Sequence, residues 1–154
     1  MIISRAAEPD AGEILTLQRA AYVAEAQLYG DPFLAPLVEP HEQVRALFGD
    51  GDAVVLKAVD GTRIIGAVRA RIQEETCLVG RLVVAPDRQG EGVGSALMKA
   101  AEAEVAGRAT ALVLFTGHLS EGNLRLYRRL GYAEFRRERV SDHLVLVHLR
   151  KPLG

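Results

Sequence analysis

Hydrophobic residues recur along the first third of the chain with the spacing of an α-helix. Ile14, Leu17, Ala21, Ala24 and Leu28 define one buried face of a long helix. Asp10 and Glu13 form a capping-box pattern at its start, and Gly30-Asp31-Pro32 ends it. After an irregular stretch with prolines at 32, 36 and 40, a second, short helix is expected over His41–Phe48.

Runs of β-branched and apolar residues, bounded by turn residues, predict seven strands. Their expected ranges are Met1–Ala6, Ala53–Val59, Arg63–Ile72, Thr76–Val84, Ala109–Phe115, Tyr132–Val140 and His143–Leu149. Asp60-Gly61 favours a tight hairpin between two of them, and Ser141-Asp142 joins the last pair.

Two further helices are expected, one from Glu91 to about Ala106 and one over Ser120–Leu130, with Gly131 at its C-terminal cap. The predicted order is β-α-α-β-β-β-α-β-α-β-β. A strand–helix–strand unit almost always forms a right-handed crossover, so Thr76–Val84 and Ala109–Phe115 should be parallel neighbours. The fold class is therefore α/β (α+β) with a mixed sheet, helices on both faces and a single domain over residues 1–154.

Composition fits this picture and narrows the class of protein. With 154 residues, 49% apolar and 25% charged, the chain suits one globular core. A formal net charge of −1 gives no reason to expect nucleic acid as a partner. The single Cys77 cannot form an internal disulfide, the first residues lack a signal-peptide pattern, and no apolar run is long enough to span a membrane. A cytoplasmic location without membrane attachment is the expectation.

The stretch from Leu82 to Leu97 carries the chemistry. Proline cannot donate to a strand ladder, so the strand should end at Pro86. Gly90, Gly92 and Gly94 then let a ligand approach the backbone closely, just before a helix start with free N–H groups. Strand, glycine turn and helix start together predict a site for a ligand that carries pyrophosphate.

Two of the three ligand classes that use this geometry fit poorly. A Walker-type nucleotide loop needs Gly-Lys-Ser/Thr, whereas Gly94 is followed by Ser95 and Ala96. A dinucleotide fold needs a carboxylate at the end of the next strand, but that strand runs into Thr116-Gly117-His118. A dinucleotide fingerprint also normally follows the first strand of its domain, and this one lies in the middle of the chain.

The third class fits. Gln89-Gly-Glu-Gly92-Val-Gly94 resembles the acyl-CoA signature Gln/Arg-x-x-Gly-x-Gly/Ala of the GNAT N-acetyltransferase superfamily. Val84-x-Pro86 precedes it, and Asn123-Leu-Arg-Leu-Tyr-Arg-Arg-Leu-Gly-Tyr132 resembles the family's fourth-helix motif, which ends Tyr-x-x-x-Gly-Phe/Tyr. The order of elements agrees with that family along nearly the whole chain.

The resemblance implies acetyl-CoA as cosubstrate and a place for it. In the family the two parallel central strands splay apart, and the pantetheine arm lies between them. By position, Leu82, Val83 and Val84 would bind the arm, and one of their N–H groups would meet the acetyl carbonyl. The residues expected to bind acetyl-CoA are Leu82, Val83, Val84, Arg88, Gln89, Gly90, Glu91, Gly92, Val93, Gly94, Ser95, Ser120, Asn123 and Tyr127.

Within that set, Ser120 stands where many family members carry an asparagine that contacts the cofactor. That contact is therefore expected from either Ser120 or Asn123. Ser120 would also cap its helix.

Tyr127 is the expected catalytic residue. The resemblance makes it the general acid that protonates the departing CoA thiolate, and a phenol is a reasonable donor at a partly dry site. The alternative is an aromatic residue that closes the core. The general base stays open between His118, whose ordinary pKa suits the task, and Glu75 acting through water.

The acceptor pocket is expected between the first two helices and the final hairpin. The candidate acceptor-binding residues are Tyr22, Glu25, Tyr29 and His118, with Asp31 and the proline-rich segment beside them. No metal-ligand spacing is present, so no metal is expected.

The sequence thus predicts an N-acetyltransferase that moves an acetyl group from acetyl-CoA to a primary amine by direct attack in a ternary complex. The alternatives are an acyl-CoA-binding sensor without turnover and a nucleotide-binding protein. The acceptor, which is a small molecule or a protein amine, the use of other acyl groups and the oligomeric state stay open; a homodimer is one outcome, because dimers are common in the family.

Overall fold

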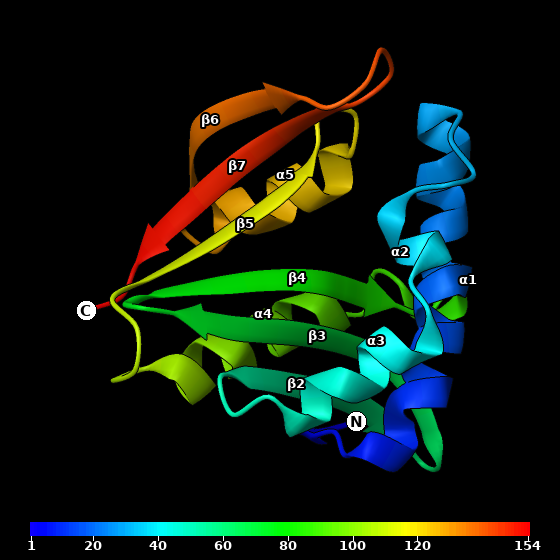
Figure 1. Ribbon diagram of the computed structural model, residues 1–154, viewed down its shortest axis with the longest axis vertical. Coiled ribbons are helices and arrows are strands. Elements are labelled where there is room, and N and C mark those ends of the chain that lie inside the picture. The colour runs from blue at the N-terminus through cyan, green and yellow to red at the C-terminus, as the bar shows by residue number, and fades with distance from the viewer.

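A computed structural model describes residues 1–154, and its centre is one seven-stranded mixed sheet with the order β1-β2-β3-β4-β5-β7-β6 (Figure 1). The strands are β1 (Ile2–Arg5), β2 (Ala53–Asp60), β3 (Arg63–Gln73), β4 (Thr76–Val84), β5 (Ala111–Gly117), β6 (Ala133–Arg139) and β7 (Val145–Pro152). All neighbours are antiparallel except β4 and β5. The predicted fold class is confirmed, and so is the parallel pairing of β4 with β5.

Helices cover both faces of the sheet, as predicted. They are α1 (Ala11–Tyr29), α2 (Ala35–Val38), α3 (His41–Ala46), α4 (Val93–Val105) and α5 (Glu121–Arg129). In Figure 1, α3 lies in front of the strands, α2 lies against α1, and α4 and α5 lie behind the strands. None of these helices is both long enough and apolar enough to cross a membrane.

The two faces of the sheet have separate cores. The larger core lies between the sheet and α4, and includes Leu97, Met98 and Leu112, each fully buried. The smaller core lies under α1, where Ile14 and Leu17 pack on β2 and β3. Each face thus buries one stripe of a helix, which explains the helical spacing in the sequence.

β4 and β5 pair only at their first residues. The register joins Thr76 to Ala111, Cys77 to Leu112 and Leu78 to Val113, and then the pairing stops. Beyond that point the strands separate, and Figure 1 shows the opening widening toward α1. The splayed pair implied by the family resemblance is therefore present, and the last six residues of β4 have no strand partner on the β5 side.

A β-bulge interrupts β4 on its other side. Arg81 has a positive φ of 52°, and the register against β3 shifts between Ala67 and Arg69. A bulge adds one residue and so reverses which face the following side chains occupy. Val79 accordingly packs in the α4 core, whereas Val83 packs in the α1 core.

Several details of the sequence prediction are wrong. Asp10 and Glu13 form no capping box: Asp10 accepts the Ala7 N–H before the helix, and Glu13 accepts the Ile64 N–H from β3. Ala24 and Leu28 are exposed, because the C-terminal half of α1 extends beyond the sheet core.

Other differences concern where elements begin and end. α4 begins at Val93 rather than Glu91, because Gly92 has a φ of 84° and occupies the cap position. The proline-rich segment contains the one-turn helix α2, which begins after Leu34. The last hairpin has a wider loop than predicted, closed by a hydrogen bond from Val140 N–H to the Leu144 carbonyl.

We predict that Gly66→Ala destabilises the fold. A Cβ at Gly66 would lie 2.9 Å from Leu97 Cδ1, 2.9 Å from Val93 Cγ1 and 3.2 Å from the Val83 carbonyl oxygen. Overpacking of this kind costs about 1–3 kcal/mol. At about 2–4 °C per kcal/mol, calorimetry should show a clear fall in Tm.

Gly80→Ala is the matched control, because Gly80 lies on the neighbouring strand and a Cβ there meets no atom within 4 Å. Its Tm should stay unchanged or rise slightly, since alanine restricts the unfolded chain. Equal losses of Tm in the two variants would contradict the packing argument.

Candidate active site

A cavity of about 690 Å³, which we name the turn cavity, lies beyond the unpaired end of β4. It is walled by the end of β4, the glycine turn, the start of α4 and the start of α5. Predicted site residues that line it are Leu82, Val83, Val84, Arg88, Gln89, Gly90, Gly92, Val93, Gly94, Ser95, Ser120 and Asn123. Sequence motifs about 40 residues apart therefore meet around one space.

The glycine turn presents its backbone to this cavity. Gly90 and Gly92 have φ angles of 79° and 84°, and a Cβ at either position would meet no atom within 4 Å. α4 follows directly with 13 residues, so its first N–H groups and its dipole face the same space. The arrangement suits a phosphate-bearing ligand held by main-chain donors.

Arg88 is already held by carboxylates. Its guanidinium donates to Asp60 at 2.7 Å and to Glu91 at 3.1 Å. Glu91 is turned toward Arg88 and does not line the turn cavity, unlike the other predicted residues of the loop. Any anion that Arg88 binds must therefore share it with two carboxylates.

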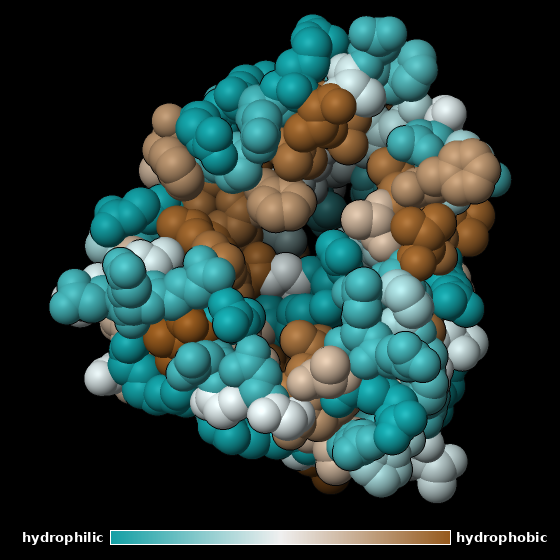
Figure 2. Space-filling view, viewed as in Figure 1, coloured by the Kyte–Doolittle hydropathy of each residue, from teal (hydrophilic) through white to brown (hydrophobic).

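A second cavity of about 410 Å³ adjoins the first, and we name it the aromatic cavity. Figure 2 shows a hollow in the upper half of this face, with hydrophobic atoms around it. Its lining includes Tyr22, Glu25, Tyr29, Asp31, Phe33, Pro36, Arg81, Leu82, Phe115, Asn123, Tyr127, Leu144 and Leu146. Four residues, Tyr22, Glu25, Leu82 and Asn123, line both cavities, so the two spaces meet.

Tyr127 lines the aromatic cavity near that junction. Its side chain is buried, and its ring packs edge-on against Tyr132 with centroids 6.0 Å apart. Burial raises the pKa of Tyr127 well above its ordinary value, and the carboxylate of Glu25 raises it further. The phenol therefore stays protonated and available as a donor.

A chain of hydrogen bonds ends at Glu25. The Ser120 hydroxyl donates to Glu25 Oε2 at 2.6 Å and also lies 2.7 Å from the Tyr29 hydroxyl. Because Ser120 has only one proton to give, Tyr29 must be the donor in the second bond. Tyr29 in turn accepts the Leu119 N–H at 3.0 Å. The donors all point toward Glu25, whose carboxylate faces both cavities.

Gly117 makes room for this chain. A Cβ at Gly117 would lie 2.0 Å from the Tyr29 hydroxyl, so only glycine allows the ring to pack there. Ser120 is buried and uses its hydroxyl for Glu25 and Tyr29, and makes no side-chain cap on α5. The predicted capping role of Ser120 is therefore wrong.

A buried ion cluster, made of Gln18, Glu39, Arg69 and Arg81, adjoins the aromatic cavity. Arg69 donates to Glu39 Oε2 at 2.9 Å, and Gln18 donates to Glu39 Oε1 at 3.0 Å. Burial alone raises the pKa of Glu39, but hydrogen bonds from Arg69 and Gln18 and the two guanidinium charges lower it to about 2. Sequence patterns gave no sign of this cluster, whose members come from four segments of the chain.

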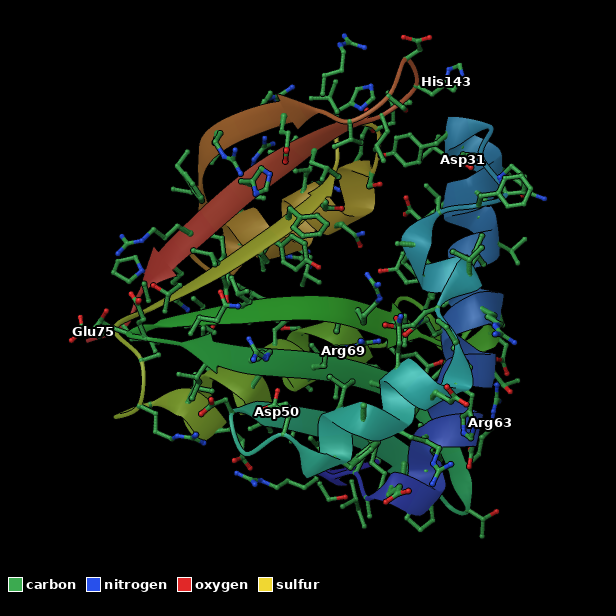
Figure 3. All side chains as sticks on the ribbon, in the orientation of Figure 1. Asp31, Asp50, Arg63, Arg69, Glu75 and His143 are labelled. Carbon is green, nitrogen blue, oxygen red and sulfur yellow. The ribbon has the colours of Figure 1, made fainter.

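The structure places two other candidates outside the site. His118 lines neither cavity, and its Nδ1 accepts the Val145 N–H at 3.1 Å. Glu75 lies at the far end of β4 (Figure 3). It precedes Leu82 by seven positions, which corresponds to about 23 Å along a strand. Glu75 is therefore far from both cavities, whereas the ring of His118 packs against that of Tyr29, with centroids 5.8 Å apart. Asn123 lies within the site, with its amide donating to Thr116 at 3.3 Å.

Comparison with known proteins agrees with this geometry. A family model described as "Acetyltransferase (GNAT) domain" matches residues 19–153. No curated protein matches the sequence of the chain.

Solved structures share the fold at low sequence identity. The ribosomal-protein-S18-alanine N-acetyltransferase from Escherichia coli superposes with a TM-score of 0.82 at 15% identity, covering 98% of this chain and 92% of its own. Ribosomal-protein-alanine N-acetyltransferase from Brucella melitensis gives 0.79 at 21% identity, with coverages of 99% and 100%. An aminoglycoside 6'-N-acetyltransferase complexed with coenzyme A gives 0.76 at 19%, with coverages of 99% and 97%.

We predict that Glu39 stabilises the fold in a pH-dependent way. Its pKa falls from an ordinary value of 4.5 to about 2, so its contribution is complete above about pH 4.5 and is lost as the pH falls toward 2. The contribution is on the order of 2–3 kcal/mol. Urea unfolding at pH 6, 4 and 3 should show that wild type exceeds Glu39→Gln by a margin that shrinks with acid.

Glu42→Gln provides the control for this measurement, because Glu42 is exposed on α3. Its free energy of unfolding should follow that of wild type at every pH. A constant difference between wild type and Glu39→Gln would show that the carboxylate charge contributes nothing.

Proposed function

The chain belongs to the GNAT acetyltransferase family, and from that premise we propose that it transfers an acetyl group from acetyl-CoA to a primary amine. The observation that carries the proposal is the junction of the turn cavity with the aromatic cavity. One space offers main-chain donors beside a splayed strand, and the other offers carboxylates and aromatic walls. Two substrates bound in them would meet at Leu82.

The residues around the turn cavity fit the cosubstrate. Backbone donors at Gly90, Gly92 and the start of α4 would hold the pyrophosphate, and the free edge of β4 would bind the pantetheine arm. Acetyl-CoA, when bound, supplies an activated thioester. An N–H group within 82–84, aimed at the acetyl oxygen, would stabilise the oxyanion that forms during attack by about 2.7–4 kcal/mol.

Tyr127 is proposed as the donor to the departing sulfur. It is protonated, buried and directed to the cavity next to the junction. Because burial makes it a weaker acid than an ordinary phenol, it would first donate a hydrogen bond and release its proton only as thiolate charge develops.

Glu25 is proposed as the group that takes the proton from the amine. It lines both cavities, and Ser120, which itself accepts a hydrogen bond from Tyr29, donates to one of its oxygens and leaves the other free. An ammonium group must lose a proton before its nitrogen can attack the thioester. A carboxylate at the junction would take this proton directly, whereas His118 and Glu75 line neither cavity.

The neighbours support an amine as the acceptor. Three proteins of similar structure are ribosomal-protein-alanine or aminoglycoside N-acetyltransferases, which by name acetylate nitrogen. The carboxylates of Glu25 and Asp31 line the aromatic cavity, and their negative charge also favours an acceptor that carries an ammonium group. We therefore assign N-acetylation to this chain.

We predict that Tyr127→Phe lowers kcat by about 10²–10³-fold, because the departing sulfur loses its donor. The Kd for acetyl-CoA, measured by titration calorimetry, should stay within about twofold, since the phenol contacts the sulfur chiefly during bond breaking. Turnover is followed as CoA release over a panel of amines.

Tyr132→Phe is the matched control: it removes another buried phenol, which donates to Glu102 at 3.1 Å outside both cavities. It should keep kcat. A protein that binds acetyl-CoA but acetylates no amine would be the sensor instead, and one that binds NAD or ATP in its place would belong to another class.

We also predict that Glu25→Gln lowers kcat/KM by about 10²-fold near neutral pH. The loss should shrink as the pH rises toward the pKa of the acceptor amine, because a free amine needs no base. Asp31→Asn serves as comparison, since Asp31 lines the same cavity but bonds only the Phe33 N–H. A deficit that is constant with pH would mean that Glu25 merely positions Tyr29 and Ser120.

A further inference from the structure

We propose that Arg81 binds a carboxylate of the acceptor, so that the substrate is a small amino-acid-like molecule carrying both an amine and a carboxylate. This inference rests on the proposed function and names its substrate class. It starts from one arginine whose hydrogen-bonding state differs from that of its neighbour in the buried ion cluster.

No side-chain N–H group of Arg81 makes a hydrogen bond within the protein, and its one ion pair, with Glu39, is long. Its Nε is fully buried without a hydrogen bond and lies 3.7 Å from Glu39 Oε1. Arg69, by contrast, donates two hydrogen bonds to Glu39 and one to Gln18. An arginine side chain only 23% exposed, on the wall of a cavity, is expected to have partners for its donors.

Within the buried ion cluster the charge is also unbalanced. Two guanidinium groups, those of Arg69 and Arg81, face the single carboxylate of Glu39, and Gln18 is neutral. A buried, uncompensated charge is unfavourable unless an ion of opposite sign arrives. A carboxylate carries one negative charge and two oxygens, which match the planar fork of a guanidinium.

The backbone directs Arg81 toward this role. A positive φ is uncommon for a residue other than glycine, and here it occurs at the bulge beside the open edge of β4. The side chain lines the aromatic cavity instead of following the regular alternation of the strand. Strained residues at bulges are often found at binding sites.

The rest of the aromatic cavity complements the remainder of such a substrate. Glu25 and Asp31 bring negative charge from α1 and the residues after it, whereas Arg81 brings positive charge from β4. Arg69 on β3 lies with Arg81 in the buried ion cluster and does not line the cavity. Figure 3 shows Asp31 at the upper end of α1 and Arg69 on β3, well apart. Phe33, Phe115 and other apolar residues form walls between them, which suits an apolar side chain.

This charge arrangement disfavours the other classes of amine. A peptide N-terminus has a neutral amide where an amino acid has its carboxylate, so the surplus charge of Arg81 would stay unbalanced. An aminoglycoside carries several positive charges and would be repelled by Arg81. A zwitterionic amino acid with an apolar side chain matches the cavity at both ends, because its amine faces the carboxylates and its carboxylate faces Arg81.

The test compares matched acceptors with wild-type protein and acetyl-CoA. The panel holds apolar amino acids such as L-phenylalanine, their carboxamides, the decarboxylated amines and short peptides, with rates corrected for the fraction of free amine. We expect kcat/KM for the amino acid to exceed that for its carboxamide by about 10–100-fold, the range of a hydrogen-bonded charge pair.

Arg81→Asn should remove that preference. Asparagine tolerates positive φ, so the bulge can persist. The amino acid should lose about 10–100-fold in kcat/KM while the carboxamide and the KM for acetyl-CoA stay unchanged. Arg81→Lys keeps the positive charge but lacks the planar, two-pronged guanidinium. Its kcat/KM for the amino acid should lie between those of wild type and Arg81→Asn. Arg71→Gln, on β3 and outside both cavities, is the control and should behave as wild type.

Each outcome of these measurements either supports or overturns the assignment of Arg81 to the acceptor's carboxylate. Equal rates for amino acid and carboxamide, or a peptide as the best acceptor, would overturn the carboxylate assignment and leave the acetyltransferase standing. A rise in the KM for acetyl-CoA in Arg81→Asn would show that the guanidinium binds the cosubstrate. That result would also overturn the carboxylate assignment. Acetylation of no amine at all would end both proposals, and thermal unfolding of each variant separates loss of fold from loss of binding.

Discussion

The early end of the pairing between β4 and β5 is the constraint on which the site depends. β5 keeps seven paired residues with β7, and β4 stays paired with β3, so each strand follows its antiparallel partner once the three parallel pairs end. Main-chain groups left without partners are unfavourable unless water or a ligand satisfies them. The sheet thus holds open a slot with donors and acceptors along its edge.

The bulge at Arg81 links this opening to the second cavity. One extra residue in β4 places Val83 in the core under α1 and leaves Leu82 at the junction of the two cavities. The same residue, through its positive φ, carries a guanidinium into the wall of the aromatic cavity. A single irregularity therefore shapes both the edge of the strand and the pocket beside it.

The parts of the site that could be predicted from sequence are those written within a few consecutive residues. The glycine turn, the end of β4 and Tyr127 each follow from local backbone preferences or from a motif of under a dozen positions. Contacts between distant segments could not be predicted: Glu39 meets Arg69 across 30 residues, and Ser120 meets Glu25 across 95. The exposure of Leu28 likewise depends on where the sheet ends beneath α1.

This division also separates the two binding tasks. The turn cavity presents mainly backbone donors, whose chemistry changes little when side chains change, so one geometry can persist among proteins that share few residues. The aromatic cavity is built from side chains of α1, α2, β4, β5 and the final hairpin, and each can vary without disturbing the glycine turn. Specificity for the acceptor is therefore expected to lie in long-range side-chain contacts, where Arg81, whose Nε has no hydrogen bond, and the carboxylate of Glu25 are found.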